Sequence, residues 1–299
     1  MASVLQLVEK YNSRKKCCEF LESLRWPDGI QCPRCNSEKI YQVKTRFKYE
    51  CECGYQFSVT SGTIFHRSHL PLQKWIIACM LIANAKKGIS AKQLERDLSV
   101  TYKTAWYMAH RIRRAMKEGS VIRKMRGILE TDETYVGGKA RKIRGRGAKN
   151  KVVVGGVLER GSWVTAKVLE NASISEVCKP VYENADIENI SMVCADEWTG
   201  YNQLKNEFNL QRVSHGCGEY VRGLVHTNGI ENFWCIFKRG IIGSFHKISR
   251  KYMQLYLDEF TYRFSWTAKG RPLHGKKSNG AFMEKILKNA LIVDPASKG

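Results

Sequence analysis

The sequence has 299 residues, 43% of them hydrophobic, and carries 50 Lys and Arg against 28 Asp and Glu, a formal net charge of +22. This composition excludes wholesale disorder and leaves room for a full core plus one or two small modules. The basic excess favours a polyanionic partner, because a basic surface gains affinity by releasing counterions from phosphates.

The chain shows no signal for export or for membrane insertion. Its longest apolar run, Trp75 to Ala83, is too short to cross a bilayer, and its N-terminus lacks the apolar segment and cleavage site of a signal peptide. We therefore expect a cytoplasmic, nucleoid-associated protein without a membrane partner. Eleven cysteines, an odd number, favour reduced thiols and metal ligation over disulfides.

The first module that the sequence predicts is a zinc ribbon within residues 1–68. Ile40 to Val43 and Arg46 to Glu50 can form the arms of a hairpin. Two cysteine pairs flank it: Cys32 with Cys35, and Cys51 with Cys53. Four thiolates are a ligand set of structural Zn²⁺, although adventitious buried cysteines would also explain them. The other cysteines are scattered and are expected to be small core residues.

A helical module is predicted over residues 69–126. Helical periodicity marks three segments: the first is Pro71 to Lys86, the second can be capped by Ser90, and the third can start at Thr101. The last two segments, joined by a short turn, have the outline of a helix-turn-helix, although a plain helical linker would show the same periodicity. The second of them is expected to present basic residues to DNA: Lys103, His110, Arg111, Arg113 and Arg114.

A strongly basic segment lies between Gly138 and Lys151 and contains no acid. Such a segment is typical of a loop that becomes ordered on nucleic acid, although an inert solvated linker would have the same composition. Its basic residues are Lys139, Arg141, Lys142, Arg144, Arg146, Lys149 and Lys151.

Residues 127–266 alternate predicted strands and helices, and residues 267–299 are expected to form a basic C-terminal tail. The strands are Ile128 to Thr131, Val152 to Leu158, Trp163 to Leu169, Ile190 to Ala195 and, weakly, Leu210 to Val213. The helices are Ser173 to Asn184, Gly200 to Phe208, Gly229 to Gly240 and Lys251 to Phe264. This order is expected of an α/β fold of the ribonuclease-H-like type, with a mixed five-stranded sheet and helices.

Three acids occupy positions suited to a metal site that cuts phosphodiesters. Asp132 and Asp196 each follow a short apolar run that predicts a buried strand, and Glu231 lies on a predicted helix. Lys238, seven positions after Glu231, projects from the same side of that helix. Carboxylates from separate elements can hold two Mg²⁺ or Mn²⁺ ions beside a phosphate. An ordinary solvated helix face would also explain Glu231 and Lys238.

Four further residues lie beside these acids in the sequence. Glu130 is expected to share the face of Asp132, because residues two apart on a strand point the same way. Glu133 and Glu197 are expected to face elsewhere. His226 is expected to have a structural role at the start of its helix.

Four runs occur together in this chain: Trp26 to Gly29, Ser61 to Phe65, Asp132 to Gly138, and His226 to Trp234. Their combination resembles bacterial insertion-sequence transposases related to the Merlin superfamily, over nearly the whole chain. The resemblance implies a DDE-type enzyme in which Asp132, Asp196 and Glu231 bind metal, accompanied by Lys238. Some relatives carry Asn as the third residue, so Asn228 and Asn232 keep that assignment open.

The implied reaction is DNA cleavage at the terminal inverted repeats of a mobile element, followed by transfer of the freed 3′-hydroxyl to a target strand. Its partners would be double-stranded end and target DNA, bound by a homodimer or a larger assembly. Two alternatives remain: a DNA-binding regulator without catalysis, which explains the charge and the cysteines equally well, and a ribonuclease-H-like nuclease without strand transfer.

Overall fold

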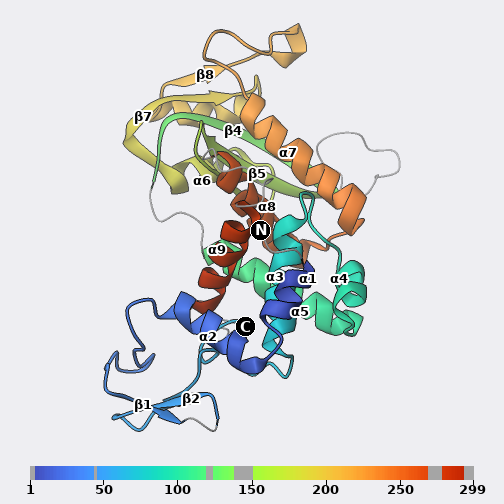
Figure 1. Ribbon diagram of the computed structural model, residues 1–299. Coiled ribbons are helices and arrows are strands. Elements are labelled where there is room, and N and C mark those ends of the chain that lie inside the picture. Colours follow the sequence, from blue (N-terminus) through green and yellow to red (C-terminus); the bar gives the residue numbers. More distant parts are fainter. Residues whose placement is uncertain (1–3, 44–45, 119–123, 138–150, 269–277, 293–299) are drawn as a thin grey trace. The chain divides into compact units, whose positions relative to one another are not determined.

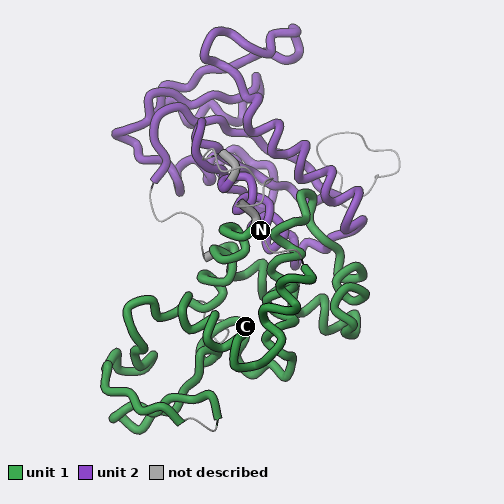
Figure 2. The backbone as a smooth tube through the Cα atoms, in the orientation of Figure 1, with its two compact units in different colours: residues 1–119, 272–299 green, residues 120–271 purple. Residues whose placement is uncertain are grey.

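The computed structural model describes residues 4–43, 46–118, 124–137, 151–268 and 278–292 (Figure 1). The chain divides into two compact units: unit 1 is residues 1–119 with 272–299, and unit 2 is residues 120–271 (Figure 2). The predicted basic loop falls on residues 138–150, which lie outside the described residues.

Unit 1 combines a small antiparallel sheet with a helical core. The strands pair in the order β1-β2-β3, so the predicted hairpin is present, with its second arm starting two residues later than predicted. The described elements of this unit are α1 (Val4–Lys10), α2 (Arg14–Arg25), β1 (Ile40–Val43), β2 (Lys48–Cys51), β3 (Gln56–Phe57), α3 (Leu72–Asn84), α4 (Ala91–Leu98), α5 (Tyr102–Glu118) and α9 (Ser278–Ile292).

Helix α3 forms the centre of the helical core because nearly all of it is apolar. Every residue from Trp75 to Ala83 except Leu81 is buried. A helix that is apolar on all sides needs neighbours on all sides. Helices α1, α2, α4, α5 and α9 supply them.

The two helices that follow α3 start where the sequence predicts. The hydroxyl of Ser90 accepts the backbone N–H of Gln93 at 3.1 Å, which caps α4. Ser99, in the left-handed region at φ 48°, ends α4 and turns the chain into α5. Helices α4 and α5 pack against each other. That α4 and α5 bind DNA as a helix-turn-helix stays a prediction.

The prediction of a basic tail over residues 267–299 is wrong for residues 278–292. These residues form α9, which packs against α2, α3 and α5. Phe282, Ile286 and Ala290 recur every fourth residue and are fully buried. Interspersed lysines give the segment its basic composition and conceal the apolar stripe.

Unit 2 is built on a five-stranded mixed sheet with the strand order β6-β5-β4-β7-β8. Strands β4, β5 and β6 form antiparallel pairs, whereas β7 and β8 run parallel to β4. The described elements of this unit are β4 (Met125–Gly137), β5 (Lys151–Glu159), β6 (Val164–Val168), α6 (Ile174–Asn184), β7 (Ala185–Ala195), η1 (Thr199–Asn206), β8 (Leu210–Arg212), η2 (His215–Cys217), α7 (Asn228–Gly240), η3 (Ile241–Phe245) and α8 (Arg250–Ala268).

The largest differences from the prediction in unit 2 concern β4, β7 and η1. Strand β4 extends six residues beyond the predicted end at Thr131, so Asp132 lies inside the strand. Strand β7 begins at Ala185 rather than at the predicted Ile190. The predicted helix Gly200 to Phe208 is a 3-10 helix, η1. In each case the element lies where it is predicted, and polar residues conceal its length or type.

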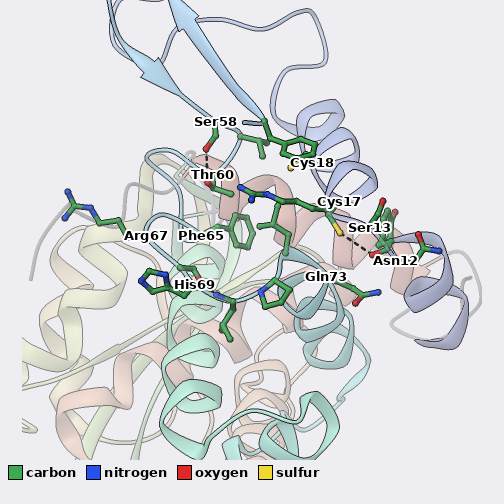
Figure 3. A pocket seen from close by; sticks show the side chains of 18 residues that line it. Asn12, Ser13, Cys17, Cys18, Ser58, Thr60, Phe65, Arg67, His69 and Gln73 are labelled. Atoms are coloured by element: carbon green, nitrogen blue, oxygen red, sulfur yellow. Dashed lines mark hydrogen bonds between the residues drawn. The ribbon is translucent and has the colours of Figure 1, made fainter. Parts of the chain in front are cut away.

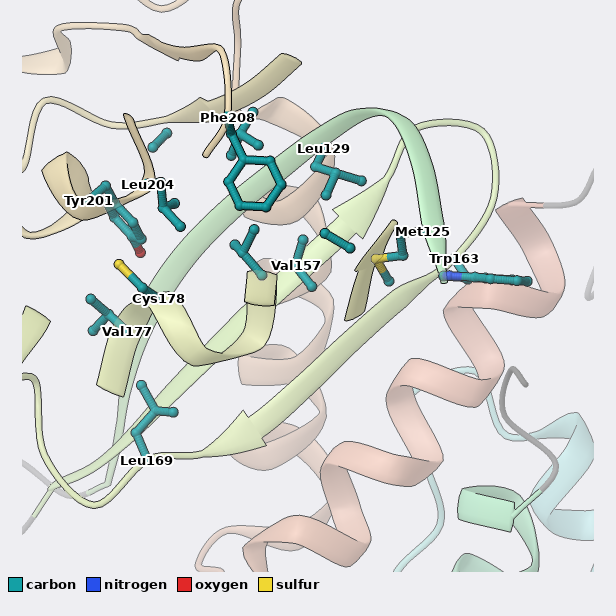
Figure 4. Close-up of a cluster of buried hydrophobic side chains, with 14 residues drawn as sticks. Met125, Leu129, Val157, Trp163, Leu169, Val177, Cys178, Tyr201, Leu204 and Phe208 are labelled. Atoms are coloured by element: carbon teal, nitrogen blue, oxygen red, sulfur yellow. The ribbon is translucent and has the colours of Figure 1, made fainter. Parts of the chain in front are cut away.

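The sheet buries both faces, and β4 alternates between them. On one face Leu129 and Val157 pack with Val177 of α6 and Tyr201 of η1 (Figure 4). On the other face the strands pack against α7 and α8, through side chains that include Phe233. Because neighbouring strand residues point to opposite faces, Glu130 and Asp132 lie on the α7 face.

Among the described helices, none combines the length and the apolar composition needed to cross a bilayer.

Candidate active site and cysteine cluster

The parallel pairing of β4 and β7 places Asp132 and Asp196 side by side. Glu130 of β4 is the register partner of Cys194 of β7. Asp132 and Asp196 each come two residues later, at the same level of adjacent strands and on the same face. Asp196 follows the last residue of β7, and its Oδ1 accepts the backbone N–H of Trp198 at 3.1 Å.

The third acid comes from the first turn of α7. The Thr227 hydroxyl donates to Glu231 Oε1 at 2.5 Å, and His215 Nε2 lies 3.5 Å from the same oxygen. The Glu231 side chain is 42% exposed. Its carboxylate is therefore oriented by two neighbours and still open to solvent.

Two glycines allow α7 to approach the sheet. A Cβ added to Gly156, the partner of Asp132 on β5, would lie 2.8 Å from the Trp234 ring. A Cβ added to Gly229 would lie 2.8 Å from Glu130 Oε2. Both distances are shorter than carbon and oxygen atoms tolerate, so larger residues would push the helix away from the strands.

The pKa of Asp132 is raised by its surroundings in this site. Burial raises its pKa well above the ordinary value, and the negative charges of Glu133, Asp196 and Glu231 raise the pKa further. The charges of Asp196 and Glu231 therefore act on Asp132 through space. Within the described residues the three acids do not form a closed group of metal ligands, as four cysteines do. Repulsion between like charges opposes such closure, and a divalent cation would reverse it.

Replacing Asp132 with asparagine is expected to stabilise the cation-free protein. When folding raises the pKa of a carboxyl, the folded protein loses stability as the pH rises from about 4 through the raised pKa, because the buried group must then ionise. At pH 7 without divalent cations, Asp132→Asn should raise the Tm by at least about 2 °C, and the gain should vanish below about pH 4. Saturating Mg²⁺ should stabilise the unmodified protein more than the variant. Thermal unfolding in EDTA and in Mg²⁺ measures both, and a lower Tm for Asp132→Asn in EDTA would contradict this electrostatic account.

The cysteine cluster in unit 1 has the geometry of a structural zinc site. The sulfur atoms of Cys32, Cys35, Cys51 and Cys53 all lie within 4.8 Å of one another. Cys32 Sγ is 3.8 Å from Cys53 Sγ, and Cys35 Sγ is 3.5 Å from Cys51 Sγ. Four thiolates at these distances fit one tetrahedral Zn²⁺ ion.

Backbone turns shape the two cysteine knuckles. The N–H of Asn36 donates to the carbonyl of Cys32, and the N–H of Gly54 donates to the carbonyl of Cys51. Asn36 and Gly54 adopt positive φ values of 58° and 77°, which Asn and Gly accommodate at low cost. Side chains behind the knuckles, among them Trp26, pack into a small aromatic cluster.

The predicted DNA-contacting face of α5 is partly wrong. Arg113 is 2% exposed and His110 is 6% exposed, so neither side chain is available to DNA. Arg111 donates to the carbonyls of Ile64 and His66. The physical reason is that α3, α4 and α9 all pack against α5 and cover more of its surface than its periodicity indicates. Two predicted residues remain exposed, Lys103 and Arg114.

The acids and histidine beside the triad have structural partners. Glu133 Oε2 accepts the hydroxyl of Tyr201 at 2.7 Å. Glu197 Oε1 accepts the backbone N–H of Gly216 at 3.0 Å. His226 Nδ1 lies 3.3 Å from Glu130 Oε1, at the start of α7. Glu133 and Glu197 are thus held by hydrogen bonds, whereas His226 Nδ1 makes none within the described residues.

Asn228 and Asn232, the two alternatives to Glu231 as third residue of the triad, are both exposed on α7, as is Lys238. Glu231 differs from both asparagines because its charge acts on Asp132.

Sequence reasoning missed Thr227 and His215, which contact Glu231. Thr227 lies in a run already quoted, four residues before Glu231, where the helical spacing could have revealed it. No local pattern marks His215.

Two parts of the chain match known domain families. Residues 124–265 match the ISXO2-like transposase domain, and residues 12–56 match the transposase zinc-ribbon domain. The chain belongs to the insertion-sequence transposases with a zinc ribbon. This confirms the resemblance stated from the sequence, and the domain implies the ribonuclease-H-like fold that the strand order predicts.

A relative supports the same assignment across most of the chain. An uncharacterized protein in transposable element ISH50 of Halobacterium salinarum is 28% identical over 279 residues, covering 86% of this chain and 92% of the relative. Because it covers 86% of the chain, the likeness extends beyond either domain match.

Proposed function

We propose that the chain cleaves DNA at the terminal inverted repeats of a mobile element and joins the freed end to target DNA. The observation that carries this proposal is the register of β4 and β7, which sets Asp132 beside Asp196. Helix α7 brings Glu231 to the same face of the sheet. This arrangement lies within the part of the chain that matches a transposase domain.

Asp132, Asp196 and Glu231 would hold two Mg²⁺ or Mn²⁺ ions. Such ions lower the pKa of an attacking hydroxyl and neutralise charge on the leaving oxygen. Hard oxygen ligands suit them, and the repulsion of Asp132 by Asp196 and Glu231 fits a site that binds cations. Thr227 and His215 contact Oε1 of Glu231 and would orient its carboxylate.

Two phosphoryl transfers make up the proposed reaction. In the first, a water oxygen bonds to phosphorus at the end of the element, and the bond to the 3′ oxygen breaks, which leaves a 3′-hydroxyl. In the second, that hydroxyl bonds to a target phosphorus and displaces the target's own 3′ oxygen. Lys238, exposed on α7, would bind a phosphate beside the carboxylates.

DNA binding is proposed for unit 1 and for the basic loop. In unit 1 the candidates are the zinc ribbon and the exposed residues Lys103 and Arg114 of α5. The loop offers Lys139, Arg141, Lys142, Arg144 and Arg146, which lie outside the described residues. Acting on two element ends together requires at least a dimer on DNA.

Affinity for end DNA is expected to depend steeply on salt. A protein that makes about six to ten phosphate contacts loses roughly 10³- to 10⁵-fold in affinity between 50 and 200 mM salt. Fluorescence anisotropy with labelled end DNA over this range measures the slope. Affinity that does not change with salt would contradict a phosphate-binding surface.

A cleavage assay separates the proposal from its alternatives. Labelled DNA with the element's ends should be nicked in Mg²⁺ and remain intact in EDTA, and the new 3′ end should join a target duplex. A non-catalytic regulator would bind the ends without nicking them. A nuclease without strand transfer would nick them and yield no joined product.

A further inference from the structure

Glu130 is a buried acid on β4 that the proposed chemistry does not use. Its side chain is 1% exposed. Its Oε2 accepts the backbone N–H groups of Gly229 at 2.7 Å and Ile230 at 3.0 Å. These amides belong to the first turn of α7, where N–H groups have no partner inside the helix. The carboxylate therefore completes their hydrogen bonding and meets the positive end of the helix dipole.

The usual local cap is absent from the start of α7. Thr227 occupies the N-cap position, but its hydroxyl donates to Glu231 and makes no capping bond. The cap comes instead from a strand residue 99 positions earlier in the chain. The start of α7 is thus tied to the strand that carries Asp132.

Arg160 holds the other oxygen of Glu130. Its Nε donates to Glu130 Oε1 at 2.6 Å. Its two terminal nitrogens donate to the carbonyls of Leu224 at 2.6 Å and His226 at 2.8 Å. A planar guanidinium that uses several donors at once fixes geometry as well as charge. One side chain thereby joins the end of β5, strand β4 and the segment leading into α7.

We propose that Glu130 and Arg160 are positioning residues that fix the start of α7 so that Glu231 faces Asp132 and Asp196. The proposal rests on the proposed function of this site. Glu231 is the residue after Ile230, so a shift of the first helical turn moves its carboxylate equally. Mutation of groups that hold metal ligands in place typically lowers metal affinity or activity by about 10- to 100-fold.

The first test replaces Glu130 with glutamine, which has nearly the same shape. A neutral amide has one acceptor oxygen, so it cannot serve both the helix amides and Arg160. Glu130→Gln should weaken Mn²⁺ binding, measured by titration, by about 10- to 100-fold. End-DNA binding should be unchanged, and amide exchange at Gly229 and Ile230 should be faster.

Two further variants separate positioning from general stability. Gly229→Ala keeps all charges but places a Cβ 2.8 Å from Glu130 Oε2, so it should weaken Mn²⁺ binding as well. Glu259→Gln is the matched control, because Glu259 is as buried as Glu130, at 1% exposed, and pairs with Arg263 at 3.2 Å within α8. This control should lower the Tm and leave Mn²⁺ affinity unchanged.

A double variant tests whether Glu130 and Arg160 act as one unit. Glu130→Gln combined with Arg160→Gln should bind Mn²⁺ little worse than either single variant. The proposal is overturned if Glu130→Gln lowers the Tm with unchanged Mn²⁺ affinity, or if Glu259→Gln weakens Mn²⁺ binding to the same degree. Mn²⁺ titration does not require turnover, so a wild-type chain that fails to cleave DNA would reject the proposed function separately.

Discussion

Asp132→Asn and Asp196→Asn are each expected to abolish cleavage at the element's ends while leaving the affinity for end DNA unchanged. Each change removes a charged ligand from the proposed pair of cations. Metal ions supply several kcal/mol of transition-state stabilisation, so the cleavage rate should fall by at least about 10³-fold. Single-turnover cleavage of labelled end DNA, with binding measured in parallel, tests this expectation.

A matched control lies on β7, the strand that Asp196 follows. Asp186, at the other end of β7, pairs with Arg126 at 2.9 Å and lies far from the triad in register. Asp186→Asn makes the same chemical change and should keep the cleavage rate. Normal cleavage by Asp132→Asn or Asp196→Asn would remove that residue from the triad.

Cys32→Ser and Cys51→Ser are expected to release zinc and unfold the ribbon. The three-stranded sheet of unit 1 is small, and its aromatic cluster packs directly on these two buried cysteines. Structural zinc contributes about 10–16 kcal/mol in small zinc domains, far more than such a core supplies alone. The zinc content measured by elemental analysis should fall from one zinc per chain to near zero, and limited proteolysis should cut within the ribbon.

An exposed cysteine outside the ribbon provides the control for zinc content. Cys235 lies on α7, and Cys235→Ser should leave one zinc bound per chain. Full zinc content in Cys32→Ser or Cys51→Ser would show that the cluster is not the zinc site. Retention of the ribbon's fold after zinc removal would instead show that the metal is dispensable for it.

The fold of unit 2 could be predicted because its signals are local. Apolar runs mark the strands, and the stripe of Ile230, Phe233, Trp234 and Phe237 marks α7, all four of which are buried. The end of β4 could not be predicted in the same way. Between Glu130 and Gly137 its polar residues, including Asp132, interrupt the apolar run that defines a strand.

Other features depend on contacts between distant segments. Arg113 has the position of an exposed basic residue on an amphipathic helix, and its burial depends on the packing of α3, α4 and α9 on α5. The roles of Glu130 and Arg160 depend on backbone groups of residues 224–230, far along the chain. The spacing of residues along the sequence does not predict such contacts. The adjacency of Asp132 and Asp196, by contrast, follows from the order of the strands.

The proposed reaction requires that carboxylates from β4, β7 and α7 bind the same divalent ions. A crystal structure with end DNA and Mn²⁺, with the metal located by anomalous scattering, would show whether they do. We expect two Mn²⁺ ions roughly 3.5–4 Å apart, coordinated by Asp132, Asp196 and Glu231. Mn²⁺ bound elsewhere, or bound by one of these acids without the others, would contradict this expectation.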